Sequence, residues 1–228
     1  MKTLVIVPAY NEEGSIVSTV DELCATVPGV DYVIVNDGSR DATARLCREH
    51  GFNVIDQPVN LGLTGAFQTG MKYAHRNGYD VALQFDADGQ HMPAFIPEIV
   101  ETMDQQKADI AIGSRFVTQK KPVSARMMGS NLISALIKVT TGQRINDPTS
   151  GMRAYGRAMI EEFAMRPDLS PEPDTLAFLI RKRHAKVIEC QVTMRERTAG
   201  QSYLTPLKSI SYMLNACTSI LFAQWFRR

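Results

Sequence analysis

Two acidic residues, Asp86 and Asp88, are the sharpest chemical feature of this 228-residue sequence. They follow an apolar run, and their spacing places both side chains on the same side of an extended chain. Two carboxylates held close together repel each other unless a cation lies between them. Hard divalent ions take carboxylate oxygens and keep positions open for phosphates. The pair therefore predicts a Mg²⁺ or Mn²⁺ site, to which Gln90 could add a third oxygen, with a plain acidic turn as the alternative.

Two other polar motifs also follow apolar runs. Residues 8–13 (PAYNEE) come after the first run, and residues 36–39 (NDGS) come after the second. Each could be only a loop and a helix cap, because Asp37 and Ser39 are good capping residues. In open α/β sheets, however, ligands bind beyond the carboxyl ends of the strands. Three polar motifs at one edge of a sheet therefore indicate a single site.

The first half of the chain alternates short apolar runs with segments of helical spacing. The expected strands are Leu4–Val7, Tyr32–Val35, Asn53–Ile55, Val81–Phe85 and Asp109–Ile112. The expected helices are Glu12–Thr26, Asp41–His50, Leu63–Arg76 and Pro93–Gln106. Asp41 can cap the second helix, and Pro93 suits the first turn of the fourth. Strands that are apolar throughout are typical of parallel sheets covered on both faces, so we predict an α/β fold with a mostly parallel sheet flanked by helices.

The second half is less regular. We expect helices at Ser124–Thr141, Arg157–Met165 and Thr175–Arg183, a turn at Asp147–Gly151 and a strand at Val187–Val192. The length fits one domain, which we place at residues 1–204, followed by a C-terminal amphipathic helix at 205–228.

The C-terminal segment Ser209–Phe226 contains no charged residue. It carries too many polar side chains for a comfortable transmembrane span. Its apolar residues recur at helical spacing, and Trp225, Phe226, Arg227 and Arg228 close the segment. An interfacial membrane helix has this pattern, and so does a helix that packs against a partner protein or against the core.

Charge is unevenly distributed along the chain, although the net charge is only +1. Up to Ser114 there are 7 Lys and Arg against 16 Asp and Glu, and beyond it 18 against 8. The second half is therefore expected to meet phosphates or lipid headgroups, or else to present a solvated basic face. No interleaving of basic and aromatic residues points to nucleic acid. Four scattered cysteines and a short N-terminal apolar run predict reduced thiols, no signal peptide and a cytoplasmic location.

Two common nucleotide-binding fingerprints are absent from the sequence. No G-x-G-x-x-G follows the first expected strand, and no G-x-x-x-x-G-K-[ST] occurs. Gly62 and Gly65 open a helix instead, where close packing of the helix against the sheet is the simpler explanation than a ligand.

Six motifs in fixed order, PAYNEE, VNDGSRD, NLGLTGA, FDADGQH, GSRF and DPTSGMRAY, resemble those of the family 2 glycosyltransferases. The sequence is most similar to the dolichyl- or polyprenyl-phosphate sugar transferase branch, from Leu4 to about Tyr203. The resemblance implies a glycosyltransferase A type fold, with a nucleotide-binding half at 1–114 and an acceptor-binding half at 115–204. It also implies inverting, metal-dependent transfer from a nucleoside-diphosphate sugar to a polyprenyl phosphate or a cell-surface glycan, at the inner face of the cell membrane.

The resemblance also implies roles for individual residues. The nucleotide would be framed by Pro8, Tyr10, Glu12, Asp37, Asp86 and Ala87. The metal would be held by Asp86, Asp88 and Gln90. Phosphate and acceptor contacts would come from Arg115, Arg126, Arg197 and Ser202, and acceptor chemistry from Asp174, with Glu172 as its backup. The chain departs from the branch at Tyr203, where lysine is usual, and so lacks one positive charge for a phosphate.

The nature of the acceptor decides whether a base is needed. A phosphate monoester, with a second pKa near ~6, is already nucleophilic at neutral pH. A sugar hydroxyl needs a carboxylate within hydrogen-bond reach, for which Asp174 is the candidate unless it only caps a helix. In both cases the metal would neutralise charge on the departing diphosphate.

Two other functional classes compete with a glycosyltransferase, namely a nucleotidyltransferase and a non-catalytic partner that binds nucleotide sugars or a membrane protein. The first lacks support because residues 8–13 contain neither Gly nor a basic residue. The second conflicts with the intact Asp86–Asp88 pair. A homo-oligomer is possible in each case.

Overall fold

The computed structural model describes residues 1–228 except 123, 196–212, 214 and 223–228. The strands of the described residues are β1 (Thr3–Ala9), β2 (Asp31–Asn36), β3 (Val54–Asp56), β4 (Val81–Gln84), β5 (Ile110–Ser114), β6 (Arg153–Gly156) and β7 (Val187–Gln191). The helices are α1 (Ile16–Thr26), α2 (Thr43–Glu49), α3 (Gly62–Arg76), α4 (Ile96–Gln105), α5 (Ala125–Thr141), α6 (Arg157–Met165) and α7 (Pro173–Arg183), with a 3₁₀ turn η1 (Pro93–Phe95).

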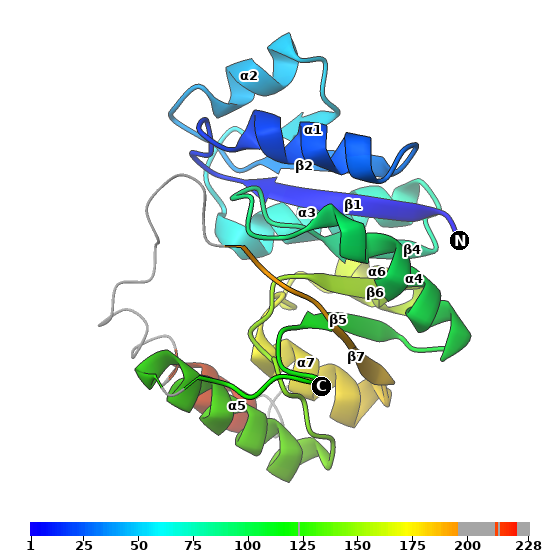
Figure 1. Ribbon diagram of the computed structural model, residues 1–228, viewed down its shortest axis with the longest axis vertical. Coiled ribbons are helices and arrows are strands. Elements are labelled where there is room, and N and C mark those ends of the chain that lie inside the picture. The colour runs from blue at the N-terminus through cyan, green and yellow to red at the C-terminus, as the bar shows by residue number, and fades with distance from the viewer. Residues whose placement is uncertain (123, 196–212, 214, 223–228) are drawn as a thin grey trace.

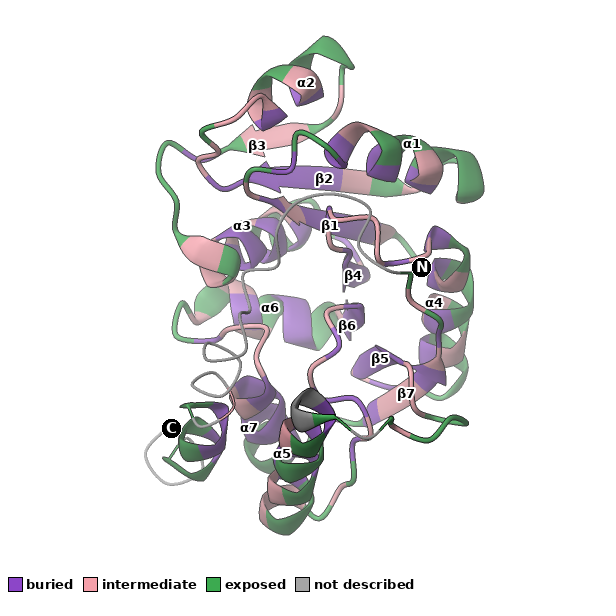
Figure 2. Cartoon of the chain, turned by 60° about the vertical axis from the view of Figure 1, so that its left-hand side comes forward, coloured by how far each residue is buried: buried purple, intermediate pink, exposed green. Residues whose placement is uncertain are grey.

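The strands form one sheet in the order β3-β2-β1-β4-β6-β5-β7, with helices on both faces (Figure 1). Alternate residues of β1 enter different cores: Leu4 and Ile6 pack with α3, α5, α6 and α7, whereas Val5 and Val7 pack with α1 and α4. Figure 2 shows the central strands buried between helices whose outer faces are exposed. The mostly parallel α/β sandwich predicted from the apolar strands is confirmed.

The sheet has a topological switch point at β1. From β1 the chain moves outward to β2 and β3, and then crosses to β4 on the other side, so that β1 pairs in parallel with both β2 and β4. In doubly wound sheets the crevice beyond such a switch point holds the ligand. The motifs after β1, β2 and β4 therefore face a common crevice by topology alone.

The strand β6 was not predicted, and it is the antiparallel member of the sheet, between β4 and β5. It is only four residues long and begins with Arg153, whose side chain is 3% exposed. A short run that starts with a charged residue carries no strand signal. Its position depends on long-range contacts of Arg153, described below.

Several predicted boundaries were wrong by a few residues. The first helix begins at Ile16, because residues 12–15 form a turn in which the Ser15 amide donates to the Glu12 carbonyl. Pro93 begins the 3₁₀ turn, and α4 starts only at Ile96. Asp41 does not occupy the N-cap position of α2, although its carboxylate accepts the Thr43 amide.

The predicted start of α5 is confirmed. Ser124 is its N-cap, and its hydroxyl oxygen accepts the Met127 amide at 3.2 Å. Gly142 ends the helix in the left-handed conformation, with φ +79°.

The predicted C-terminal helix lies partly outside the described residues. Its described part is helical, and one side buries Ala216, Cys217 and Ile220 in the core cluster, while Leu221 and Phe222 are exposed. Packing against the core, one of the open readings, is therefore observed for this part. Within the described ranges, no helix combines the length and the apolar character needed to cross a membrane.

Candidate active site

The loops that follow β1 and β2 are tied together by hydrogen bonds. The Asn11 amide donates to the Ser39 hydroxyl at 2.9 Å, and the Glu12 amide donates to the Thr43 hydroxyl at 2.8 Å. Glu12 is 9% exposed, and its carboxylate accepts the Ser15 hydroxyl at 2.8 Å. These hydrogen bonds hold the PAYNEE and NDGS loops together, as the positions of the two motifs at neighbouring strand ends predicted.

Asp37 connects the NDGS loop to the NLGLTG segment at residues 60–65. Its side chain is 3% exposed, and its Oδ1 accepts the Leu61 amide at 2.7 Å. The next residue, Gly38, has φ +65°, and a Cβ there would lie 2.6 Å from the Val59 carbonyl carbon. Only glycine fits this close approach, which brings the NLGLTG segment against the NDGS loop.

The Asp86–Asp88 motif lies in a turn and not in a strand. β4 ends at Gln84, so strand alternation does not orient the two carboxylates as the sequence analysis assumed. Specific contacts hold them instead: Gln84 Nε2 donates to Asp86 Oδ1 at 3.0 Å, and Asp88 Oδ1 accepts the Gln90 amide at 3.1 Å. The Thr19 hydroxyl donates to the Ala87 carbonyl at 3.1 Å and so connects this turn to α1.

His91 orients Asp86, a role that the sequence analysis missed. The Asp86 amide donates to His91 Nδ1 at 3.0 Å, which leaves the proton of the neutral ring on Nε2. That nitrogen lies 3.6 Å from Asp86 Oδ2, and the imidazole is 3% exposed. A buried histidine thus fixes the backbone of Asp86 and lies beside its carboxylate.

Gly151, in the DPTSG motif, also borders Asp86. A Cβ on this glycine would lie 2.5 Å from Asp86 Oδ2 and 3.3 Å from His91 Cε1. The neighbouring Ser150 hydroxyl donates to the Gly113 carbonyl at 2.6 Å, which anchors the turn to the end of β5. The absence of a side chain at Gly151 leaves room around the carboxylate.

Arg115, predicted to reach substrate phosphates, is held by Asp147. Its backbone amide donates to Asp147 Oδ2 at 3.1 Å, and its Nε and Nη2 donate to the two carboxylate oxygens at 2.7 and 2.8 Å. Asp147 is fully buried, and its own amide donates to Glu189 at 2.8 Å. The GSRF and DPTSG motifs are therefore joined by a buried ion pair. A phosphate contact by Arg115 stays a prediction.

Arg153 links the DPTSG turn to the segment that carries the predicted acceptor residues. Its guanidinium donates to the Pro148 carbonyl and, at 3.3 Å, to the Pro171 carbonyl. Glu172 is the N-cap residue of α7, and Asp174 lies in the first turn of that helix. A carboxylate at this end of a helix is stabilised by the helix dipole.

The segment after β7 returns to the Asp86–Asp88 turn. Met194 forms an antiparallel bridge with His91, and the Arg195 amide donates to the Gln90 carbonyl at 3.0 Å. The Arg195 guanidinium forms two hydrogen bonds of 2.8 Å with Glu22 on α1.

Three other predicted contacts are not described in the structure. Arg197 and Ser202 lie outside the described residues, as does Tyr203. Arg126 lies on α5, and its side chain is outside the described part of the structure.

The oxygen donors around Asp86 suit a hard divalent ion. Asp86, Asp88 and Gln90 offer two carboxylates and an amide oxygen, and the gap at Gly151 leaves space beside Asp86. Mg²⁺ is usually bound by one or two carboxylates and completed by substrate phosphates and water. In the part of the chain that the structure describes, no cluster of three or more His, Cys, Asp or Glu forms a ready-made cage. The residues fit an ion that is shared with a diphosphate.

A family model described as "Glycosyl transferase family 2" matches residues 4–164. The chain belongs to this family. Family 2 glycosyltransferases similar to it include an undecaprenyl-phosphate mannosyltransferase of Micrococcus luteus, which is 31% identical over 90% of this chain and 88% of the relative. A polyprenol monophosphomannose synthase of Mycolicibacterium smegmatis is 30% identical over 90% of this chain and 81% of the relative. The predicted family and enzyme class are confirmed.

A solved structure shows the same fold. It is a glucosyl-3-phosphoglycerate synthase from Mycobacterium tuberculosis in complex with Mn²⁺, uridine diphosphate and phosphoglyceric acid. It matches with a TM-score of 0.69 and 16% identity, over 98% of this chain and 78% of the other. The predicted glycosyltransferase A type fold is thereby confirmed.

Proposed function

We propose that this family 2 glycosyltransferase transfers a sugar from a nucleoside-diphosphate sugar to a polyprenyl phosphate. The observation that carries the proposal is the convergence of three motifs at the switch point of the sheet. Asp86 is bordered by His91 and Gly151, the Ala87 carbonyl accepts a hydrogen bond from Thr19 of α1, and Asp37 follows β2, which, like β4, pairs with β1. This crevice is where a doubly wound sheet binds its nucleotide.

A divalent cation, Mg²⁺ or Mn²⁺, is proposed at Asp86, Asp88 and Gln90. The ion would supply positive charge to the departing diphosphate. The protein's own part is to hold the carboxylates still, through the contacts of Asp86 with Gln84 and His91. Mn²⁺ accompanies uridine diphosphate in the structurally similar synthase, which supports the same donor chemistry here.

The donor nucleotide is proposed to lie between the loops after β1 and β2. Pro8 lies near the end of β1, Tyr10 and Glu12 lie in the loop that follows it, and Asp37 lies at the start of the loop after β2. The hydrogen bonds between these loops fix their spacing before any ligand binds. Preorganisation of this kind lowers the entropy cost of binding.

Two observations support a polyprenyl phosphate as the acceptor, namely the names of the relatives and the positive charge of the second half of the chain. Both relatives named above are called transferases or synthases of polyprenyl-phosphate sugars. The basic second half of this chain, with 18 Lys and Arg against 8 Asp and Glu, suits a phosphate and an anionic membrane surface. Arg126, Arg197 and Ser202 are the proposed phosphate contacts, and the C-terminal segment is the proposed contact with the membrane.

The experiment is a transfer assay with each of several nucleotide sugars, using undecaprenyl phosphate in detergent and Mn²⁺ or EDTA. Mass spectrometry would detect a lipid heavier by one sugar residue. We expect such a product from at least one donor, with Mn²⁺ and not with EDTA. Sugar transfer to a glycan oligosaccharide and not to the lipid would contradict the acceptor, and no transfer from any donor would contradict the proposal as a whole.

A further inference from the structure

The metal turn, residues 86–90, contacts α1 through a buried hydroxyl. Thr19 is 4% exposed, and its hydroxyl donates to the Ala87 carbonyl at 3.1 Å. A threonine within a helix can instead donate to a carbonyl one turn back in the same helix. Here the hydroxyl serves another element, at a residue that is itself 2% exposed. Because Ala87 lies between Asp86 and Asp88, this hydrogen bond acts at the centre of the proposed metal site.

A second contact reaches the metal turn through Arg195. The Arg195 amide donates to the Gln90 carbonyl at 3.0 Å, and Gln90 Nε2 donates to the Arg195 carbonyl at 3.4 Å. The Arg195 guanidinium in turn donates two hydrogen bonds of 2.8 Å to the carboxylate of Glu22 on α1. A paired arrangement of this kind fixes orientation as well as distance. Gln90, the proposed third ligand, is thereby connected to α1.

Both contacts come from one face of α1. Thr19 and Glu22 are three residues apart, a spacing that places side chains next to each other on a helix. Ile16, Val20 and Leu23 of the same helix are fully buried in the core. The helix is therefore a firm support for the metal turn, because it cannot move without disturbing the packing of these three side chains.

We propose that Thr19 and Glu22 are positioning residues for the divalent ion. Through their contacts at residues 87 and 90 they hold the metal turn on both sides of Asp88 before any ion binds. Neither residue is itself a candidate ligand. This role rests on the proposed function, since it requires the metal site at Asp86, Asp88 and Gln90.

The two contacts should differ in strength. Thr19→Val removes the hydroxyl donor of the buried Ala87 carbonyl, so Mn²⁺ binding should weaken about tenfold. Glu22→Gln breaks an ion pair with Arg195 whose side chains are 35% and 43% exposed, and its effect should be only about threefold. An exposed ion pair is screened at about 1 M KCl, whereas a buried hydrogen bond is not. At that salt concentration Glu22→Gln should match the wild type, while Thr19→Val should still bind Mn²⁺ more weakly.

The test is calorimetric titration of Mn²⁺ into the full-length protein in the presence of UDP, GDP or dTDP. The proteins are the wild type, Thr19→Val, Glu22→Gln and two matched controls. Thr140→Val removes a threonine hydroxyl whose hydrogen bond stays within α5. Glu49→Gln breaks the paired hydrogen bonds with Arg45 on α2, away from the metal turn. Thermal unfolding checks that each variant is folded.

Hydrogen exchange in EDTA measures the metal turn without any ion. The Gln90 amide is bonded to the Asp88 carboxylate, and the Asp86 amide is bonded to His91. Both amides should exchange about tenfold faster in Thr19→Val than in the wild type, because the turn then opens more often. The two control variants should keep the wild-type exchange rates.

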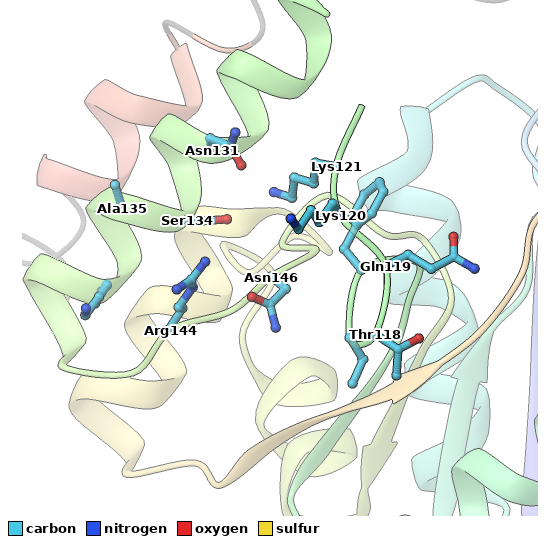
Figure 3. A pocket seen from close by; sticks show the side chains of 12 residues that line it. Thr118, Gln119, Lys120, Lys121, Asn131, Ser134, Ala135, Arg144 and Asn146 are labelled. Atoms are coloured by element: carbon cyan, nitrogen blue, oxygen red, sulfur yellow. The ribbon is translucent and has the colours of Figure 1, made fainter. Parts of the chain in front are cut away.

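The acceptor side should not respond to these substitutions. A cavity of about 870 Å³ lies between the loop of residues 116–121 and α5, the helix that carries Arg126 (Figure 3). Among the described residues, its lining includes none from α1 or from the metal turn. At saturating Mn²⁺, both kcat and the KM for undecaprenyl phosphate should therefore stay within about twofold of the wild-type values.

Each variant decides the role of its own residue. Weaker Mn²⁺ binding that excess Mn²⁺ restores to the wild-type kcat, with both controls unchanged, supports positioning. Mn²⁺ affinity in Thr19→Val or Glu22→Gln that equals the wild-type affinity would overturn the role of that residue and leave the metal site intact. A loss of kcat that excess Mn²⁺ does not restore would also overturn it. No Mn²⁺ binding to the wild type would contradict the proposed metal site, and with it the role of α1.

Discussion

Gly151 and Asp86 are in such close contact that a Cβ on the glycine would lie 2.5 Å from Asp86 Oδ2. The two residues are far apart in the sequence, and their contact brings the DPTSG motif to the proposed metal site. The carboxylate has space on this side only because residue 151 has no side chain.

Replacement of Gly151 by alanine is expected to displace the Asp86 carboxylate and to weaken Mn²⁺ binding about 10–100-fold, the range found when partners that orient metal ligands are lost. Calorimetric titration of Mn²⁺ in the presence of a nucleoside diphosphate measures this. Gly156→Ala is the matched control, because the tightest contact of its added methyl would be with the flexible end of Met103, at 3.1 Å, and the next, with the Asp109 carbonyl oxygen at 3.5 Å, is an ordinary one. Equal Mn²⁺ affinity in both variants would show that the space at Gly151 is irrelevant.

Replacement of Asp147 by asparagine should destabilise the protein, because it leaves the Arg115 guanidinium beside a neutral group in a buried setting. Loss of one partner of a buried pair costs about 3 kcal/mol, which corresponds to a fall in Tm of roughly 6–12 °C for a chain of this length. Asp168→Asn, which removes an exposed partner of Arg166, should change Tm little. Similar Tm values for the two variants would contradict the structural role of the Arg115–Asp147 pair.

Asp41 predicts a pH dependence of stability. Burial alone would raise the pKa of its carboxyl, but hydrogen bonds from the Thr43 hydroxyl and from the amides of Thr43 and Glu13 outweigh burial and lower the pKa below 3.8. Because the folded pKa is lowered, the carboxylate stabilises the fold at neutral pH, and this contribution is lost as pH falls through the folded pKa.

Asp41→Asn should therefore lower the free energy of unfolding at pH 7 by about 1 kcal/mol. The difference from the wild type should shrink below about pH 4, and urea denaturation at several pH values measures it. A difference that stays constant between neutral and acidic pH would contradict the assigned hydrogen bonds.

Substitution of Asp174 tests whether the acceptor is a lipid phosphate or a sugar hydroxyl. If a lipid phosphate attacks, no base is required, and Asp174→Asn should keep the transfer rate within about threefold, as should Glu172→Gln. If a hydroxyl attacks, removal of its base costs about 10²–10⁴-fold. Initial rates of transfer at saturating donor distinguish these outcomes, and a large loss with intact donor binding would refute the polyprenyl-phosphate acceptor.

Much of the fold could be predicted because local sequence determines it. The apolar run Leu4–Val7 supplies alternate residues to two cores, and the parallel sheet follows from strands of this kind. The strand Arg153–Gly156 could not be predicted, because its placement depends on the contacts of Arg153 with the Pro148 and Pro171 carbonyls. No local pattern records such tertiary contacts.

The candidate site was predictable in its motifs but not in its geometry. Asp86, Asp88 and Asp37 were recognised by residue type at strand ends. The orienting role of His91 and the contact of Gly151 depend on two loops that meet in space, although the glycine in the DPTSG turn was a visible signal. The pairing of Arg115 with Asp147 also could not be predicted, because it joins two loops that are distant in the sequence. From the sequence alone, Asp147 was predicted only to be part of a turn.

The central claim is that Asp86 and Asp88 hold a divalent cation that binds the donor's diphosphate. The direct measurement is calorimetric titration of UDP, GDP and dTDP with Mn²⁺ or EDTA, into the wild type, Asp86→Asn/Asp88→Asn and the exposed control Asp104→Asn. We predict that at least one nucleotide binds the wild type and the control with Mn²⁺, and that EDTA or the double variant weakens binding about 100-fold. Undiminished binding in EDTA or in the double variant, or no binding of any of the nucleotides to the wild type, would contradict the claim.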